Sequence, residues 1–499
     1  MVMNKKHLRT SFLLAGALFV STGIYAVDLG EGLANESDAL LLKNHNGSYS
    51  RWNGVGNIFW NDEPNCTATL LDTRDKHNNA VGPAYLLTAA HCVVDEQAFD
   101  QPVEETVKFN YFNDTANAYK SYKINKIVWK DYKHTDLAVL ELDATLSTLL
   151  ADGINPLRMA SEWPRVTGDV LVVGAPQDLQ GSGLRLAACA QEPTGATLVE
   201  DFRAYLDTLK NRCKEIRPGS SGSPVLDRNT GQILSVLTTS TYGAKIDEKC
   251  FVNAPCEIRR GQPVLSSDTH YSVPVDYLSG CFSNGVFSND SNACAPYTTF
   301  KVLDLSWPTQ YITMPEDINS SPPAVQVDFT LSTPYYRFKT VRDVALCQSP
   351  HDYSDTFDAT DASLKAPISR ESGMHYLCII GVESADHRPS IELLKSAWVT
   401  PAQLIERTPV RTPEPTITLS ADWNYHIKWQ YSIPMYYGTL YYTSPAKDTD
   451  CNAIPVKDYI ETFEAITFTA EKLPLTLCSR NKDLSDRYSS ARTDLLALP

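Results

Sequence analysis

Long apolar segments are missing from most of this chain. After residue 26, no stretch of the 499-residue sequence approaches the roughly 18 consecutive apolar residues of a membrane-spanning helix. A basic excess is missing as well: 59 acidic residues outnumber 44 lysines and arginines, and the net charge is -15. Nucleic acids and anionic lipids attract basic surfaces, so this balance argues against both as partners.

Closely spaced cysteine pairs are also absent. None of the 12 cysteines forms a C-x-x-C pair, the spacing typical of zinc sites, so the sequence implies no metal and no cofactor. Their even number suits an oxidising compartment and six disulfides. Pairing of nearest neighbours would give Cys66–Cys92, Cys189–Cys213, Cys250–Cys256, Cys281–Cys294, Cys347–Cys378 and Cys451–Cys478. The sequence alone leaves this connectivity open.

The first 26 residues have the pattern of a secretory signal peptide. Lys5, Lys6 and Arg9 form a basic start, the segment 11–20 is almost wholly apolar, and Ala26 ends a small-residue cleavage site. The apolar run is too short to cross a bilayer. We therefore expect a soluble protein that is exported to the periplasm or secreted.

Most of the chain reads as strands. Short apolar runs, such as 84–88, 124–129 and 170–173, are bounded by Gly, Pro, Asn and Asp. One amphipathic helix is predicted over residues 200–213. On a helix, one face of that segment would hold Phe202, Tyr205, Leu206, Leu209 and Cys213. The length predicts two or three domains in an all-β protein.

An internal repeat marks the C-terminal part. Cys378 and Cys478 lie 100 residues apart, and alternation of apolar residues with period two occupies 325–331 and 425–433. We predict two tandem β-sandwich modules, residues 295–405 and 406–499, each with one disulfide. Such modules are expected to bind a surface, a substrate or another protein. We also expect a fragment that ends near residue 295 to fold without them.

Three stretches contain the residue types of an activated serine nucleophile. They are "YLLTAAHCVV" with His91, "HTDLAVLEL" with Asp136, and "RPGSSGSPVLD" with Ser221. A serine hydroxyl is a weak nucleophile at neutral pH, so it needs a base such as His91. Asp136 would fix the tautomer of that histidine and stabilise the imidazolium. The turn would aim the N–H groups of Gly219 and Ser221 at one point, where an oxyanion could develop.

Each of these residues also has a simpler interpretation. A histidine in an apolar run is usually a core residue, an aspartate before Leu-Ala-Val often caps a strand, and a Gly-Ser segment is often only a turn. The combination, in the order His91, Asp136, Ser221 and within a disulfide-rich β chain, favours the chemical interpretation.

The motifs "LTAAHC", "DLAVLEL" and "GSSGSPV" resemble the signature segments of the trypsin/chymotrypsin-like serine peptidases. The likeness covers about residues 45–285. It implies a peptidase domain over 27–294, two six-stranded β-barrels with the triad between them, and a Cys66–Cys92 disulfide that fixes the strand end before His91. It also implies an endopeptidase that cleaves polypeptide substrates through an acyl-enzyme intermediate.

Two departures distinguish this chain from the digestive members of that family. Ser220 stands where they have Asp before the nucleophile, and no Ile-Val-Gly-Gly motif follows Ala26. Activation by insertion of a new N-terminus is therefore not expected. The form "PGSSGSPV" is closer to the bacterial secreted peptidases of the glutamyl-endopeptidase type.

The resemblance also suggests a specificity pocket. The residue six positions before the nucleophile is Glu215, and the pocket wall falls near Thr238 and Ser240. An acid on a desolvated pocket floor would attract a substrate Arg or Lys, so we predict cleavage after basic residues. Because Lys214 and Arg217 flank Glu215, a solvated loop of mixed charge is the alternative.

Two other functions remain open from the sequence. The chain could be a catalytically silent binding or adhesion protein that keeps the peptidase fold and acts through its C-terminal modules. It could also be an esterase, since the same triad serves both reactions. The usual esterase fold places Ser first along the chain, whereas here His91 comes first.

Overall fold

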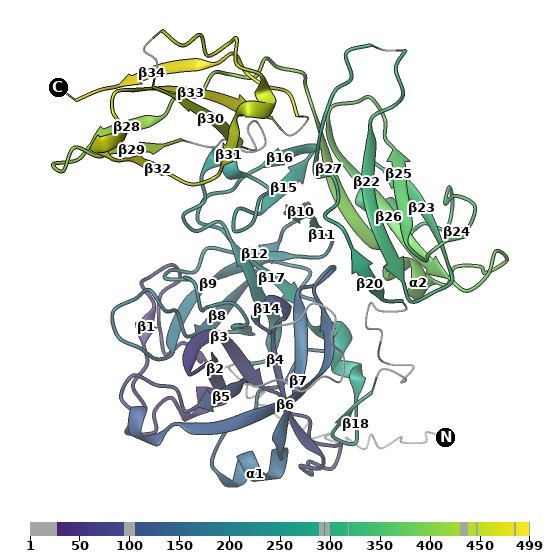
Figure 1. The fold of residues 1–499 in the computed structure, drawn as a ribbon. Coiled ribbons are helices and arrows are strands. Elements are labelled where there is room, and N and C mark those ends of the chain that lie inside the picture. The colour runs from purple at the N-terminus through teal and green to yellow at the C-terminus, as the bar shows by residue number, and fades with distance from the viewer. Residues whose placement is uncertain are drawn as a thin grey trace, which may run out of the picture.

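Strands make up nearly all regular structure of this protein (Figure 1). The computed structural model describes residues 27–93, 105–288, 294, 300–317, 319–429, 438–445, 448–483 and 486–498. The predicted signal peptide, residues 1–26, lies outside these ranges. The described ranges contain two α-helices, α1 (Leu146–Ala151) and α2 (Ile391–Lys395). Within the described ranges, no helix is both long enough and apolar enough to span a bilayer.

Six strands between Val55 and Thr145 close on themselves and form a first barrel. In barrel order the strands are β2 (Val55–Trp60), β3 (Glu63–Leu70), β4 (Pro83–Ala89), β7 (Leu137–Thr145), β6 (Lys120–Asp131) and β5 (Thr106–Phe109). Strands β4 and β7 are antiparallel neighbours, with Ala89 opposite Leu137. Because His91 follows the end of β4 and Asp136 precedes the start of β7, the pairing brings both to one barrel end.

A second barrel follows. Its strands, in order, are β8 (Gly168–Gly174), β9 (Arg185–Pro193), β12 (Leu209–Asn211), β17 (His270–Pro274), β14 (Ile233–Ser240) and β13 (Pro224–Asp227). Strand β13 pairs with β8, and β8 pairs with β9, so the circuit is closed. Strand β1 (Leu40–Leu41) extends β9, and a small hairpin joins β18 (Phe282–Ser283) to β19 (Val286–Phe287). The predicted double-barrel architecture is thus confirmed.

A third, four-stranded sheet lies between the second barrel and the C-terminal part (Figure 1). Its order is β11 (Arg203–Tyr205), β10 (Thr197–Glu200), β15 (Cys256–Arg259) and β16 (Gln262–Val264). The predicted helix over 200–213 is therefore wrong. Asp201 takes a left-handed conformation (φ 56°) that turns β10 into β11, and β12 is held between β9 and β17. Tertiary pairing overrides the helical periodicity here.

The C-terminal part contains two β modules, as predicted. The first sheet of module 1 contains β20 (Val302–Leu305), β22 (Ala324–Leu331) and β25 (Ala362–Pro367). The second sheet contains β21 (Tyr311–Thr313), β27 (Trp398–Ile405), β26 (Gly373–Val382), β23 (Tyr335–Val341) and β24 (Phe357–Asp358). Apolar side chains of both sheets, Phe329 and Trp398 among them, form one core. Module 1 is therefore a β-sandwich.

Module 2 is smaller. One sheet contains β28 (Thr416–Leu419), β29 (Tyr425–Lys428) and β32 (Ile466–Phe468), and the other contains β31 (Ile460–Thr462), β30 (Gly438–Ser444), β33 (Leu475–Lys482) and β34 (Arg492–Leu496). Ile427 and Phe468 of the first sheet pack with Leu477 of the second. A disulfide ties a central strand in each module, at Cys378 and at Cys478.

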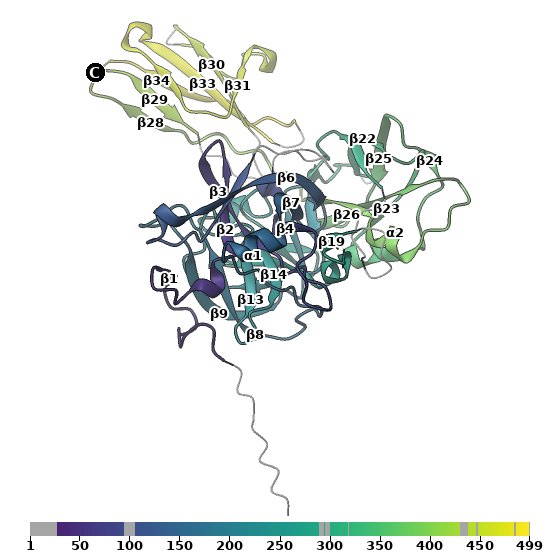
Figure 2. The same ribbon diagram turned by 90° about the horizontal axis from the view of Figure 1, so that it is seen from below.

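Module 1 shares a hydrophobic core with the third sheet. Val199 and Ala204 of the hairpin β10–β11 belong to the same buried cluster as Met374 and Tyr376 of β26. Both ribbon views place module 1 beside the barrels (Figures 1 and 2). This common core weighs against the expectation that a fragment ending near residue 295 folds independently.

Candidate active site

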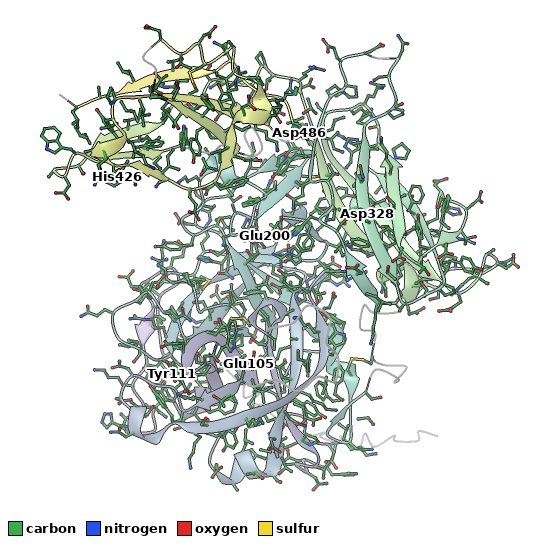
Figure 3. The ribbon with its side chains drawn as sticks, in the orientation of Figure 1. Glu105, Tyr111, Glu200, Asp328, His426 and Asp486 are labelled. Carbon is green, nitrogen blue, oxygen red and sulfur yellow. A yellow bond between two sulfur atoms is a disulfide. The ribbon has the colours of Figure 1, made fainter. Side chains whose placement is uncertain are left out.

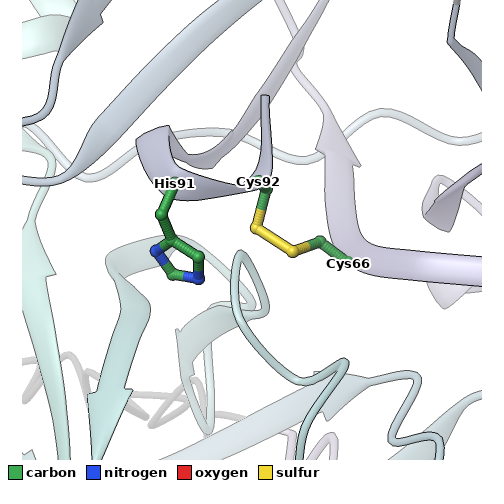
Figure 4. A group of neighbouring side chains, drawn as sticks. All are labelled: Cys66, His91 and Cys92. Carbon is green, nitrogen blue, oxygen red and sulfur yellow. A yellow bond between two sulfur atoms is a disulfide. The ribbon is translucent and has the colours of Figure 1, made fainter. Parts of the chain in front are cut away.

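His91 sits on a short helical turn, Ala90–Cys92, that directly follows β4. Cys92 forms a disulfide with Cys66 of β3, and Figure 4 shows His91 beside this bond. The two sulfur atoms are bonded to each other, so they offer no thiolate to a metal. The disulfide ties the turn that carries the histidine to the neighbouring strand. All six nearest-neighbour disulfides considered for the sequence are present.

Asp136 holds the histidine through both carboxylate oxygens. Its Oδ2 lies 2.7 Å from His91 Nδ1, and its Oδ1 accepts the backbone N–H of His91 at 2.9 Å. The Asp136 side chain is buried (2% exposed), whereas 33% of the His91 side chain is exposed. Nδ1 facing the carboxylate leaves Nε2 free to act as a base toward the cleft.

The pKa of His91 is raised above its ordinary value. Burial lowers the pKa, but the charge of Asp136 and its hydrogen bond more than offset that effect. Arg203 lowers the pKa of His91 and Glu200 raises it, so two further charges act on the same ring.

The turn at Ser221 depends on two glycines. Gly219 and Gly222 have φ of 89° and 83°, values that strain other residues. A Cβ on Gly222 would lie 2.0 Å from the carbonyl oxygen of Thr67. Thr67 also donates its hydroxyl to the carbonyl of Gly219 (2.9 Å) and its N–H to the carbonyl of Ser221 (2.9 Å). The turn is therefore packed tightly on strand β3.

The backbone donors of this turn divide into two sets. The N–H groups of Ser220, Gly222 and Ser223 donate to carbonyls of the protein. Among the hydrogen bonds between described residues, none uses the N–H of Gly219 or Ser221. Two such unused donors, two residues apart in one tight turn, are what an oxyanion site requires.

One cleft of about 630 Å³ joins these groups. Its lining includes His91, Asp136, Gly219 and Ser221. No hydrogen bond between Ser221 and His91 occurs among the described contacts. Such bonds are often long without substrate and shorten in the complex.

Only some of the residues predicted to form the specificity pocket lie in the cleft. Thr238 and Ser240 line the cleft, but Glu215 does not. Glu215 lies in a left-handed conformation (φ 58°), and its carboxylate pairs with Arg185 at 3.3 Å. The loop thus directs the acid toward β9, and the basis for cleavage after Arg or Lys is lost. The prediction that Glu215 forms the pocket floor is corrected accordingly.

Other cleft residues escaped the sequence interpretation. Arg217 lines the cleft and stacks on Tyr242, 3.8 Å from the ring centre. Glu200 and Arg203 line it too, and both are buried. Figure 3 shows Glu200 at the third sheet. The sequence analysis recognised Arg217 only as a charge beside Glu215. Glu200 and Arg203 were missed because they belong to the segment 200–213, which was predicted to be a helix.

Residues 66–236 match the family model of the trypsin-like peptidase domain. The match contains His91, Asp136 and Ser221 and ends before the C-terminal modules. We refer below to the two barrels and the third sheet as the peptidase region. The nearer likeness to glutamyl-type endopeptidases stays a prediction.

Several solved structures are similar to this part of the chain. The active form of the Rv3671c protease from M. tuberculosis has 17% identity and a TM-score of 0.31, covering 52% of this chain and 92% of that chain. Human heparin binding protein has 14% identity and a TM-score of 0.32, covering 48% and 92%. Kallikrein-related peptidase 10 has 11% identity and a TM-score of 0.30, covering 46% and 92%. At these values the likeness bears on neither substrate nor mechanism. None of the curated proteins compared matches this chain.

Proposed function

We propose that this protein is an exported serine endopeptidase with the triad His91, Asp136 and Ser221. The observation that carries the proposal is the double contact between Asp136 and His91, 2.7 Å to the ring and 2.9 Å to the backbone, in a cleft that also holds Ser221. That arrangement orients an imidazole as a base. The six disulfides support export, because disulfides persist in oxidising compartments.

In the proposed reaction, His91 Nε2 takes the hydroxyl proton of Ser221 while Oγ attacks the carbonyl carbon of the peptide bond. The N–H groups of Gly219 and Ser221 stabilise the oxyanion. His91 then returns the proton to the leaving amine, and an acyl-enzyme forms. Water, deprotonated by the same histidine, releases the acid product.

Labelling with a serine-directed phosphonylating probe tests this proposal. The wild type should take up the label, Ser221→Ala should not, and the neighbouring variant Ser220→Ala should still be labelled. Ser221→Ala should also lower kcat for peptide hydrolysis by about four to six orders of magnitude. An unlabelled wild type would favour the silent binding protein instead.

We also propose the domain division 27–294, 295–405 and 406–499. Separate core clusters in the barrels and in each module support it. Binding of a surface, a substrate or another protein by the modules stays part of this proposal.

A further inference from the structure

A buried arginine lies beside the aspartate of the triad. Arg203 begins strand β11, and only 7% of its side chain is exposed. Its Nη1 lies 4.0 Å from Asp136 Oδ2, the same oxygen that contacts His91. Its Nη2 donates to Glu200 Oε2 at 3.4 Å. One guanidinium therefore bridges two carboxylates at the wall of the cleft.

The position of Arg203 is determined by its surroundings. Its guanidinium lies 4.6 Å from the ring centre of Tyr132 and 5.7 Å from that of Tyr205. Its Nε and Nη1 are buried, and within the described part of the chain neither has a hydrogen-bond partner. Buried N–H groups of a cation that lack hydrogen bonds are costly unless nearby negative charge compensates the cation. Asp136 and Glu200 supply that charge.

Glu200 is itself fixed. Its Oε1 accepts hydrogen bonds from the hydroxyl of Thr239 and from the backbone N–H of Asn253, both at 2.9 Å. Glu200 and Arg203 are register partners in the hairpin β10–β11. The ion pair thus belongs to a hydrogen-bonded hairpin that reaches the triad from outside the two barrels.

Module 1 holds this hairpin in place. Gln310 donates its amide to the Asp201 carboxylate at the tip of the hairpin. Val199 and Ala204, on either side of the tip, pack in the core shared with module 1. In addition, His134 Nε2 lies 2.8 Å from the carbonyl oxygen of Ala397, which connects module 1 to the loop before Asp136.

We propose that Arg203 is a positioning residue for Asp136, and that module 1 keeps Arg203 in position by holding the β10–β11 hairpin. The cation compensates the charge of the Asp136 carboxylate and orients it in the buried wall, so that His91 stays in the productive tautomer. This inference rests on the proposed function of the same site.

The charges around His91 predict the direction in which each substitution shifts the pH dependence of activity. Asp136, Arg203 and Glu200 are the charged groups that act on its pKa. Arg203 lowers this pKa and Glu200 raises it. Removing the arginine charge should therefore move the acidic limb of the kcat/KM profile to higher pH. Removing the glutamate charge should move that limb to lower pH.

The experiment compares Arg203→Met, Arg203→Lys and Glu200→Gln in the full chain. We expect Arg203→Met to lower kcat by about ten- to a hundredfold with little change in KM, since a charged contact of the aspartate is lost. Arg203→Lys keeps the charge. It should have a higher kcat than Arg203→Met, and its acidic limb should lie at the same pH as in the wild type. The two charge-removing variants should shift the limb in opposite directions.

Arg185→Met provides a matched control. Arg185 is also buried (11% exposed) and pairs with a glutamate, Glu215, but neither residue lines the cleft. Its loss should lower thermal stability and leave kcat and the pH profile unchanged. If Arg203→Met does not fold, the pH position of the acidic limb can still be compared between Arg203→Lys and Glu200→Gln.

Gln310→Ala tests the contribution of module 1. Like Arg203→Met, it should lower kcat, but only by about two- to fivefold. Thr309→Ala, which removes hydrogen bonds only within module 1, should not. The proposal fails if Arg203→Met or Glu200→Gln leaves kcat and the acidic limb at wild-type values, or if Gln310→Ala matches Thr309→Ala. The absence of any Ser221-dependent hydrolysis in the wild type would instead overturn the proposed function.

Discussion

At the scale of single residues, the pH dependence of activity should report His91. The protonated ring cannot accept the serine proton, so activity falls as pH drops through the pKa of His91. Because Asp136 raises that pKa above its ordinary value, the acidic limb of kcat/KM should lie at a higher pH than the titration of a free histidine. A profile recorded in buffers of constant ionic strength measures it.

Asp136→Asn is the control for this assignment. It should lower kcat by about ten-thousandfold and move the limb of the residual activity to lower pH, because the charge that raises the pKa is gone. A limb that stays in place in the Asn variant would mean that another group titrates.

Arg217 should influence which peptides are cleaved. Its guanidinium lines the cleft together with Ser240 and Thr238, and the predicted acid Glu215 lies outside. A substrate Arg near the scissile bond would meet like charge, whereas Glu or Gln would not. We expect kcat/KM to be lower for peptides with Arg before the scissile bond than for those with Glu.

The variant Arg217→Gln should reduce that discrimination by about tenfold, the equivalent of roughly 1.4 kcal/mol. Glu215→Gln serves as the matched control and should leave it unchanged. Faster cleavage after Arg in the wild type would restore the interpretation based on the sequence.

At the scale of elements, the serine turn can be compared with a turn of similar backbone geometry. Gly222 and Gly153 have φ of 83° and 81°. A Cβ on Gly153 meets nothing within 4 Å, but one on Gly222 meets the Thr67 carbonyl at 2.0 Å. Gly153→Ala should therefore cost only the backbone strain, about 1 to 2 kcal/mol of unfolding free energy.

Gly222→Ala should cost clearly more and abolish hydrolysis, since the turn must leave strand β3. Denaturant unfolding and a peptide assay, run on both variants, separate the two contributions. Equal losses of stability in the two variants would show that the packing against Thr67 is unimportant.

The elements also show what a sequence can and cannot reveal. The barrel strands and the residues around them were predictable because His91, Asp136 and Ser221 stand in local motifs at strand ends. The segment 200–213 was not, because its apolar spacing fits a helix while its partners, β15, β9 and β17, are distant in sequence. Arg203 and Glu200 reach the cleft only through those long-range pairings, and Glu215 leaves it through the local conformation of one loop.

At the scale of the whole molecule, the two modules differ in their relation to the peptidase region. The core that module 1 shares with the peptidase region includes Val199, Ala204 and Cys256 of the third sheet, and Cys250, which forms a disulfide with Cys256. The described core clusters of module 2 contain residues of that module alone. One module is thus integrated with the third sheet beside the cleft, while the other has a separate core.

This difference predicts opposite results for two truncations. A fragment of residues 27–405 keeps the shared core and should retain the stability and kcat of the full chain. A fragment of residues 27–294 exposes Val199, Ala204 and their neighbours to water and frees the hairpin that carries Arg203. Burial of apolar surface stabilises by about 25 cal/mol per Å², so loss of this core should lower the melting temperature and favour aggregation. Thermal unfolding, size-exclusion chromatography and peptide hydrolysis, all after expression under oxidising conditions, compare the two. A soluble 27–294 fragment with full activity would show that the peptidase region is autonomous, as the sequence had suggested.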